Sequence, residues 1–104
     1  VLNDQTSLTN GKAIFDKICA VCHLVDGGGL VGPNMTDDYW IHGNTIEDMF
    51  NTVTNGVIEK GMIAYKDQYS PQQRLEVISY IITLHGTTPA TPKAPQGDLK
   101  EWPY

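Results

Sequence analysis

Apolar residues recur at helical spacing in three stretches of this chain of 104 residues. The first predicted helix runs from about Asn10 to about Ala20, and short polar side chains at Thr9 and Asn10 offer N-caps. Its apolar positions follow steps of three and four residues and are Ala13, Ile14, Phe15, Ile18 and Val21. Residues 1–8 are mostly polar and carry little pattern, so we expect a linker there.

The second predicted helix begins at Asn44 or Thr45 and ends near Asn55. Its buried stripe consists of Ile46, Met49, Phe50 and Val53. Asp48 stands three residues after Thr45, where a capping box usually has Glu or Gln. Gly56 is the expected left-handed residue at the C-terminal end.

The third predicted helix has the clearest terminal signals. We expect Ser70 to cap it, Pro71 to take its first position, Gln73 to complete a capping box and Gly86 to end it. Apolar residues cover much of its circumference, which predicts heavy burial. They are Leu75, Val77, Ile78, Tyr80, Ile81, Ile82 and Leu84.

The last segment, residues 87–104, is rich in proline, which fixes one backbone angle and removes an amide donor. We therefore expect neither helix nor sheet there, and Trp102 and Tyr104 are the side chains expected to pin it to the body. Together these patterns predict an all-α fold of three to four helices. It comprises one domain, residues 9–86, with extended N- and C-terminal segments.

The first helix ends in the run Cys19-Ala20-Val21-Cys22-His23. Two thiols three positions apart at a helix end lie on neighbouring parts of one surface, and the histidine that follows turns toward whatever they hold. This arrangement is typical of covalent haem attachment, in which each thiol forms a thioether with the porphyrin and the histidine binds the iron. We therefore predict one haem c, held by Cys19, Cys22 and His23.

Three other interpretations of this motif fit the chain less well. A thioredoxin-like redox pair needs a βαβ pattern, which the sequence lacks. A closed zinc site needs four Cys or His ligands at regular spacings, and the chain has 2 Cys and 3 scattered His. A disulfide between the two cysteines would close a very small loop and stabilise little.

Composition narrows the classes of function. The formal net charge of -5 argues against nucleic-acid binding, which needs clustered basic side chains. No apolar run approaches the roughly 20 residues of a membrane-spanning helix, and Val1–Asn10 lacks the pattern of a secretory signal. Because bacteria attach haem covalently outside the cytoplasm, we expect a periplasmic location or one on the outer face of the cytoplasmic membrane. The chain is then a processed product or a piece of a larger protein.

A glycine-dense loop follows the motif and includes Gly27–Gly29 and Gly32. Neither a P-loop lysine nor the GxGxxG spacing accompanies these glycines, so a phosphate cradle is not expected. We expect the loop to follow the edge and proximal face of the flat cofactor, with Pro33 providing a fixed turn. A backbone carbonyl held there would accept the N–H of His23 and set its tautomer.

The second iron ligand is predicted in the non-helical segment 57–65, where Met62 lies. A loop can present a thioether to the iron, whereas a methionine in a helical stripe, such as Met49, usually packs in the core. Met35 is expected to pack on the ring. The alternative ligands are His42 and His85.

With these markers the sequence resembles a class I cytochrome c over roughly residues 9–86. In that family an N-terminal helix with a glycine and an aromatic residue, here Gly11 and Phe15, crosses the C-terminal helix at an aromatic residue, here Tyr80. A glycine at this point lets the other helix approach closely. The remaining markers are the cysteine motif, Gly32-Pro33-Asn34, Thr54-Asn55-Gly56 and Gly61-Met62. Ile63 stands where a proline usually follows the ligand methionine, which leaves that loop less rigid.

Two stretches, residues 33–43 and 56–65, are similar to the C-terminal haem domain of the dihaem subunit of cbb3-type haem-copper oxidases. This resemblance implies that electrons pass from a donor cytochrome or quinol-side complex toward the oxidase core. Those subunits carry two such domains behind a membrane anchor. We therefore expect this chain to be either an excised domain or a freestanding relative.

Further haem contacts are expected outside the motif. Trp40 is predicted either in the core or at the haem edge, where its indole N–H would meet a propionate. The resemblance adds Asn55 and Tyr65 to the expected cofactor-binding residues. The full expected set is Cys19, Cys22, His23, Pro33, Met35, Trp40, Asn55, Met62 and Tyr65.

The predicted function is one-electron transfer by an iron with two axial ligands, His23 and Met62. Such an iron has no open site for oxygen or peroxide, so no catalytic residue is predicted. Three alternatives stay open at this point: a haem-based sensor in which Met62 is displaced, a peroxidase-like enzyme with five-coordinate iron, and a freestanding soluble shuttle.

Overall fold

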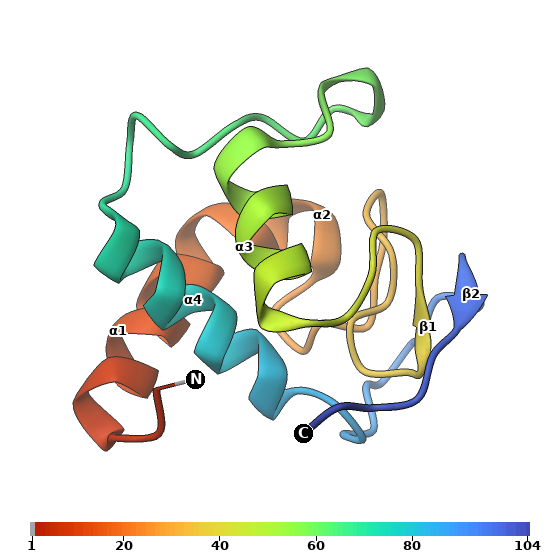
Figure 1. The fold of residues 1–104 in the computed structure, drawn as a ribbon. Coiled ribbons are helices and arrows are strands. Elements are labelled where there is room, and N and C mark those ends of the chain that lie inside the picture. The colour runs from red at the N-terminus through yellow and green to blue at the C-terminus, as the bar shows by residue number, and fades with distance from the viewer. Residues whose placement is uncertain (1) are drawn as a thin grey trace.

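The computed structural model describes residues 2–104, and Val1 lies outside the described residues. Its elements in chain order are α1 (Gln5–Ile14), a π-helical turn (Phe15–Cys19), α2 (Ala20–His23), β1 (Tyr39–Trp40), α3 (Ile46–Asn55), a 3-10 turn (Ile58–Lys60), α4 (Pro71–Thr83) and β2 (Asp98–Leu99). Figure 1 shows α1 and α4 lying against each other, α3 above them and the two strands at the opposite side. The predicted all-α class is confirmed, and the short strand pair is an addition to it.

The N-terminal helix begins earlier than predicted. It starts at Gln5 rather than near Asn10, so residues 5–8 of the predicted linker are helical and that prediction is wrong. Asp4 is the N-cap, because its carboxylate accepts hydrogen bonds from the backbone amide of Ser7 at 3.0 Å and from its hydroxyl at 2.9 Å. Gln5, Thr6 and Ser7 are polar, so this first turn leaves no apolar periodicity in the sequence, although Ser7 is buried.

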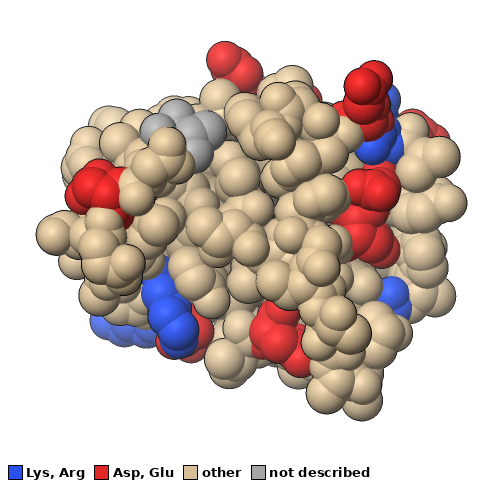
Figure 2. Space-filling view, turned by 90° about the horizontal axis from the view of Figure 1, so that it is seen from below, with Lys and Arg blue, Asp and Glu red and all other residues tan. Residues whose placement is uncertain are grey.

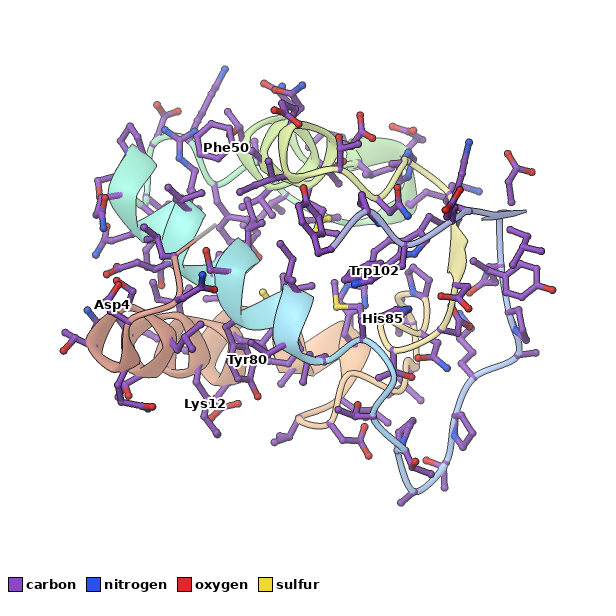
Figure 3. The ribbon with its side chains drawn as sticks, turned by 60° about the horizontal axis from the view of Figure 1, so that its bottom comes forward. Asp4, Lys12, Phe50, Tyr80, His85 and Trp102 are labelled. Carbon is purple, nitrogen blue, oxygen red and sulfur yellow. The ribbon has the colours of Figure 1, made fainter. Side chains whose placement is uncertain are left out.

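α1 and α4 cross at a glycine, as the sequence predicts. The backbone of Glu76 and the Cβ of Tyr80 occupy the space that a side chain at Gly11 would need. One turn further along, the Phe15 and Tyr80 rings are tilted against each other with centroids 5.4 Å apart. Figure 3 shows Tyr80 extending from α4 beside α1. The two helices approach backbone to backbone because residue 11 has no side chain.

The buried apolar core is small and comes from the π-helical turn, α3, α4 and the C-cap residue of α4. It consists of Phe15, Met49, Val53, Val77, Ile78, Ile81 and Leu84. Phe15 and Ile78 are completely buried at the helix crossing. Met49, Val53 and Ile81 also border the cavity described below, so one layer of side chains serves both the core and the cavity wall.

The predicted N-terminal caps of α3 and α4 are confirmed, whereas α4 ends at Thr83, before the predicted Gly86. Thr45 and Asp48 form a reciprocal capping box, with Asp in the role that Glu or Gln usually takes. Ser70 and Gln73 form a second box at the start of α4, where Pro71 is the first helical residue.

The expectation of no sheet in residues 87–104 is wrong, because Asp98–Leu99 form the strand β2. β2 pairs antiparallel with β1 and places Leu99 opposite Tyr39 and Asp98 opposite Trp40. No proline interrupts β2, so its amides are free to pair. The partner strand is distant in sequence, and for this reason local patterns do not reveal the pairing.

The two aromatic residues of the C-terminal segment pin it to the body, as predicted. Trp102 stacks on His85 with centroids 3.8 Å apart and on Trp40 at 5.9 Å. The hydroxyl of Tyr104 accepts a hydrogen bond of 2.6 Å from the first amide of α3, that of Ile46. The segment therefore lies along the body of the protein.

The surface carries acidic side chains in separate places. On the face drawn in Figure 2, red groups are spread over several positions and most of the surface is neither acidic nor basic. None of the helices within residues 2–104 combines the length and apolar content needed to cross a membrane.

The helix crossing makes a prediction about Gly11. In an exposed helix, Gly→Ala stabilises by about 1 kcal/mol. Here the added methyl group would lie about 2.7 Å from the carbonyl carbon of Glu76. We therefore expect Gly11→Ala to lower the free energy of unfolding by about 1–3 kcal/mol, measured by urea denaturation. Thr6→Ala, at an exposed position of α1, is the control and should be neutral or slightly stabilising. Equal stability of Gly11→Ala and wild type would contradict the proposed steric limit.

Candidate functional site

A cavity of about 560 Å³ lies among α2, α3, β1 and the loop that follows α3. Cofactor and ligand sites commonly have volumes of this order. Its lining is mostly apolar and contains no Asp or Glu, and Lys60 is its formally charged residue. The lining residues that carry a thiol, a thioether or an imidazole are Cys19, Cys22, His23, Met35, His42, Met49 and Met62.

A change of helical type delivers the cysteine motif to this cavity. The helix was predicted to end near Ala20. Instead, the helical path continues through the π-helical turn Phe15–Cys19 into α2, which ends at His23. A π turn holds an additional residue, so it changes the face onto which the following side chains project, and such turns occur often at functional sites. The path ends at Leu24, whose φ is 65°.

His23 is held by the glycine-dense loop in the way the sequence predicts. Its Nδ1 lies 2.8 Å from the carbonyl oxygen of Pro33. A carbonyl only accepts, so Nδ1 carries the proton and Nε2 keeps the free lone pair that a metal needs. Burial lowers the pKa of His23, against the opposing effect of the Pro33 hydrogen bond, so the imidazole is neutral at pH 7. Gly32 lies so close to the ring that a side chain there would overlap it.

The two cysteines are free thiols on the cavity wall. Burial raises the pKa of the Cys19 thiol to about 12, with a smaller contribution from Cys22. At neutral pH the Cys19 thiol is therefore protonated and sits in an apolar setting. A group that reacted with both thiols would lie inside the cavity rather than on the outer surface.

The loop that carries Met62 is closed by its own backbone. Val57 and Met62 form a β-bridge, with the Val57 amide 2.8 Å from the Met62 carbonyl and the reverse bond at 3.1 Å. The 3-10 turn and Gly61, whose φ is 87°, complete the turn between them. Farther along, the Tyr65 amide donates to the carbonyl of Val53 in α3 at 3.1 Å. Figure 1 shows this loop at the top of the view, above α3. These backbone hydrogen bonds hold the loop in place although residue 63 is isoleucine rather than proline.

Trp40 lines the cavity and presents a buried polar group. Its indole Nε1 is inaccessible and has no hydrogen-bond partner among the described residues. A buried N–H without an acceptor is costly, so such a group points to an acceptor that is not part of the chain.

Most of the expected cofactor-binding residues meet at this cavity. Those that line it are Cys19, Cys22, His23, Pro33, Met35, Trp40, Met62 and Tyr65. Asn55 is exposed at the C-terminal end of α3 and is not part of the lining. Of the two alternative ligands, His42 lines the cavity, whereas His85 pairs with Asp38 outside it.

The cavity lining also includes residues outside the expected set, among them Gly32, Met49 and Gln96. Gly32 touches the His23 ring, and its position before Pro33 is a signal that could have identified it. Met49 belongs to the buried stripe of α3 and also lines the cavity, a double role that helical periodicity does not distinguish. Gln96 reaches the lining from the C-terminal segment, and no local pattern marks it.

The helix crossing at Gly11, the histidine held by a proline carbonyl and the methionine loop together define a class I cytochrome c fold. Among solved structures, cytochrome cL from Methylophaga aminisulfidivorans has a similar fold. Its TM-score is 0.73 at 20% sequence identity, over 80% of this chain and 56% of that one.

A sequence model of the family described as cytochrome c oxidase, cbb3-type, subunit III matches residues 6–81, and this chain belongs to that family. The cbb3-type cytochrome c oxidase subunit FixP of Azorhizobium caulinodans is 34% identical over 96 residues, which cover 84% of this chain and 33% of that protein. Cytochrome c-L of Methylorubrum extorquens is 29% identical over 87 residues, covering 81% of this chain and 43% of that protein. This chain therefore spans less than half the length of these relatives.

Membership of a cytochrome c family implies haem c, and the side chains present fit that group. The apolar lining suits a flat porphyrin, and two thiols, an imidazole and thioethers form a donor set typical of haem attachment and ligation. The partnerless N–H of Trp40 suits a carboxylate such as haem carries.

The contact between Gly32 and His23 makes a prediction. A methyl group at residue 32 would lie about 2.7 Å from both ring nitrogens. We expect Gly32→Ala to displace the imidazole from the Pro33 carbonyl and to lower the free energy of unfolding by about 1–3 kcal/mol. The shift of the His23 Nδ1–H resonance in NMR spectra reports the lost hydrogen bond. Val31→Ala changes an exposed neighbour in the same loop and should leave this resonance in place. An unmoved resonance in Gly32→Ala would contradict the steric argument.

Proposed function

We propose that this chain is a one-electron-transfer domain with a single haem c, attached through Cys19 and Cys22 and ligated by His23 and Met62. The observation that carries the proposal is that one cavity brings together these four side chains from different segments of the chain. His23 offers a neutral imidazole with Nε2 free, and Met62 offers a soft thioether from a separate loop.

When bound, haem supplies an iron that alternates between two oxidation states one electron apart. The chain's residues hold and insulate it. His23 is oriented by Pro33, and a hydrogen bond to the far side of an imidazole strengthens it as a ligand. Met62 would supply the second protein ligand to the iron, and methionine ligation raises the reduction potential. With His23 and Met62 both bound, the iron would offer no site to oxygen or peroxide, which favours electron transfer over sensing and over peroxidase-like catalysis.

The electron enters and leaves through the mouth of the cavity. Four large apolar side chains that line it are exposed: Val21 by 72%, Val31 by 68%, Ile63 by 49% and Ile41 by 47%. Exposed apolar groups around a cofactor edge mark a surface for protein contact. We propose a brief encounter of small area with a redox protein at this mouth.

The partners are proposed from the family. Relatives of this chain are named as subunits of cbb3-type oxidases. We propose that this domain receives electrons from a donor cytochrome or quinol-side complex and passes them to an oxidase core. It would do so in the periplasm or on the outer face of the cytoplasmic membrane. A freestanding shuttle between the same kinds of partner is the alternative.

The methionine assignment is tested by the optical spectrum of the oxidised protein. We expect wild type to show the far-red iron–sulfur charge-transfer band and Met62→Ala to lose it. The reduction potential should fall by on the order of 0.1 V, within the roughly 0.8 V range that axial ligands span. Met35→Ala also removes a thioether from the cavity wall and should keep the band.

Absence of the band from wild type, or its survival in Met62→Ala, would overturn the ligand assignment. Carbon monoxide distinguishes the sensor alternative, because the reduced wild type should bind it poorly and Met62→Ala readily. A high-spin, five-coordinate spectrum of wild type would instead favour the peroxidase-like alternative.

The indole of Trp40 makes a prediction about pH. We expect its N–H to donate to a haem carboxylate, a bond of about 1.5–3 kcal/mol that lowers the pKa of that acid by roughly one to two units. Trp40→Phe keeps the apolar ring but removes the donor, so the carboxylate pKa rises. Since protonation raises the reduction potential, the increase in potential on acidification should begin at higher pH in Trp40→Phe. Redox titration between pH 5 and 8 measures this. Superimposable profiles for the two proteins would exclude the bond.

A further inference from the structure

The C-terminal segment, residues 87–104, lies beyond residues 6–81 that match the family. In Figure 1 it leaves α4, runs beneath the glycine-dense loop and returns beside β1. It meets the haem site at two separate places, and neither contact is explained by the proposed function alone. The first place is the run of three consecutive glycines, Gly27–Gly29.

Gly28 and Gly29 form a seat for the C-terminal segment, whereas Gly27 faces Leu84. A side chain at Gly28 would lie 2.8 Å from the Cβ of Pro89, and one at Gly29 would lie 2.9 Å from the Cβ of Lys93. The Lys93 amide also donates to the Gly28 carbonyl at 2.8 Å. Gly28 is not among the residues with positive φ, so its backbone conformation does not require glycine. Glycine is required at residue 28 because a side chain there would overlap Pro89.

Lys93, which lies on this seat, also bonds to the residues that flank Pro33, whose carbonyl holds His23. On either side of Pro33, the Lys93 ammonium donates to the Val31 carbonyl at 3.2 Å and the Asn34 amide donates to the Lys93 carbonyl at 3.3 Å. The loop is tied back to the motif as well, since the Gly29 amide donates to the His23 carbonyl at 2.9 Å. Lys93 therefore fixes the stretch of loop that contains the Pro33 carbonyl.

The second contact holds Trp40. Gly97 packs against the Trp40 backbone so closely that a side chain would overlap it. Trp102 stacks on the Trp40 ring at 5.9 Å and an interplanar angle of 23°, and His85 supports Trp102 from α4's end. Figure 3 shows Trp102 and His85 side by side. The indole whose N–H lacks a partner is thus held in place by the C-terminal segment.

We propose that residues 87–104 form a positioning strap that sets the reduction potential of the haem by fixing both the Pro33 carbonyl and the indole of Trp40. The proposal rests on the proposed function. A hydrogen bond to the iron-binding imidazole and the exclusion of water from the haem are two established controls on redox potential. Gly28 and Gly29 let the segment pack against the loop, because side chains at these two positions would occupy the space of Pro89 and Lys93.

The test uses the holoprotein and begins with Gly28→Ala. The added methyl group meets Pro89, so we expect the strap to lift and the His23 Nδ1–H of the reduced protein to exchange with solvent faster, on the order of tenfold. The midpoint potential should shift with it. Removing the opposing ring in Gly28→Ala/Pro89→Gly makes room again, and exchange and potential should return to the values of Pro89→Gly alone. Gly86→Ala is the matched control, because its φ of 79° makes alanine strained while nothing lies within 4 Å.

The other contact is tested by Trp102→Ala, with Leu99→Ala as the control at an exposed position of the same segment. We expect the Trp40 indole N–H resonance and the midpoint potential to move in Trp102→Ala only. Wild-type exchange in Gly28→Ala, or exchange in the double variant as fast as in Gly28→Ala, would overturn the strap. An unmoved potential in Trp102→Ala would do so as well. The far-red band of wild type tests the proposed function separately, so its presence together with any of these results refutes the strap alone.

Discussion

The rest of this structure depends on one constraint, the cavity among α2, α3, β1 and the loop after α3, which protein side chains line but do not fill. A chain of 104 residues has a thin core, and here the buried side chains of α3 and α4 also form the wall of a cavity of about 560 Å³. The rigid part is the crossing of α1 and α4, where Gly11 lets two backbones meet. Haem in the cavity would complete the interior, so binding of the cofactor would also stabilise the folded chain.

His23 is the last residue of α2 and Met62 lies in the loop after α3. Backbone groups rather than helix packing therefore position the two side chains proposed to bind iron. The Pro33 carbonyl orients His23, and the bridge between Val57 and Met62 closes the other loop. Loops of this kind are mobile unless something anchors them. This explains why a C-terminal segment beyond the family match makes hydrogen bonds on both sides of Pro33. The anchoring of these two loops therefore decides where His23 and Met62 lie.

Much of the fold and site could be predicted because the relevant signals are local. The Ser70 and Thr45 caps act within one helical turn, and the cysteine motif carries its chemistry in five consecutive residues. The prediction failed at residues 5–8, where a polar turn leaves no apolar pattern, and β2 was missed because its partner strand is far away in sequence. Gln96 reaches the cavity only through the path of the C-terminal segment. Asn55 is exposed at the C-terminal end of α3 and lies outside the lining.

By itself, the sequence determined the helical class, the attachment motif and the set of sulfur and nitrogen groups available to iron, because these depend on residue type and short spacing. Only the tertiary structure decided which of these groups share a cavity, that the indole N–H of Trp40 is buried without a partner, and that Gly28 faces Pro89. Each of these depends on segments distant in the chain coming together, and the positions of such segments follow from packing rather than from local preference.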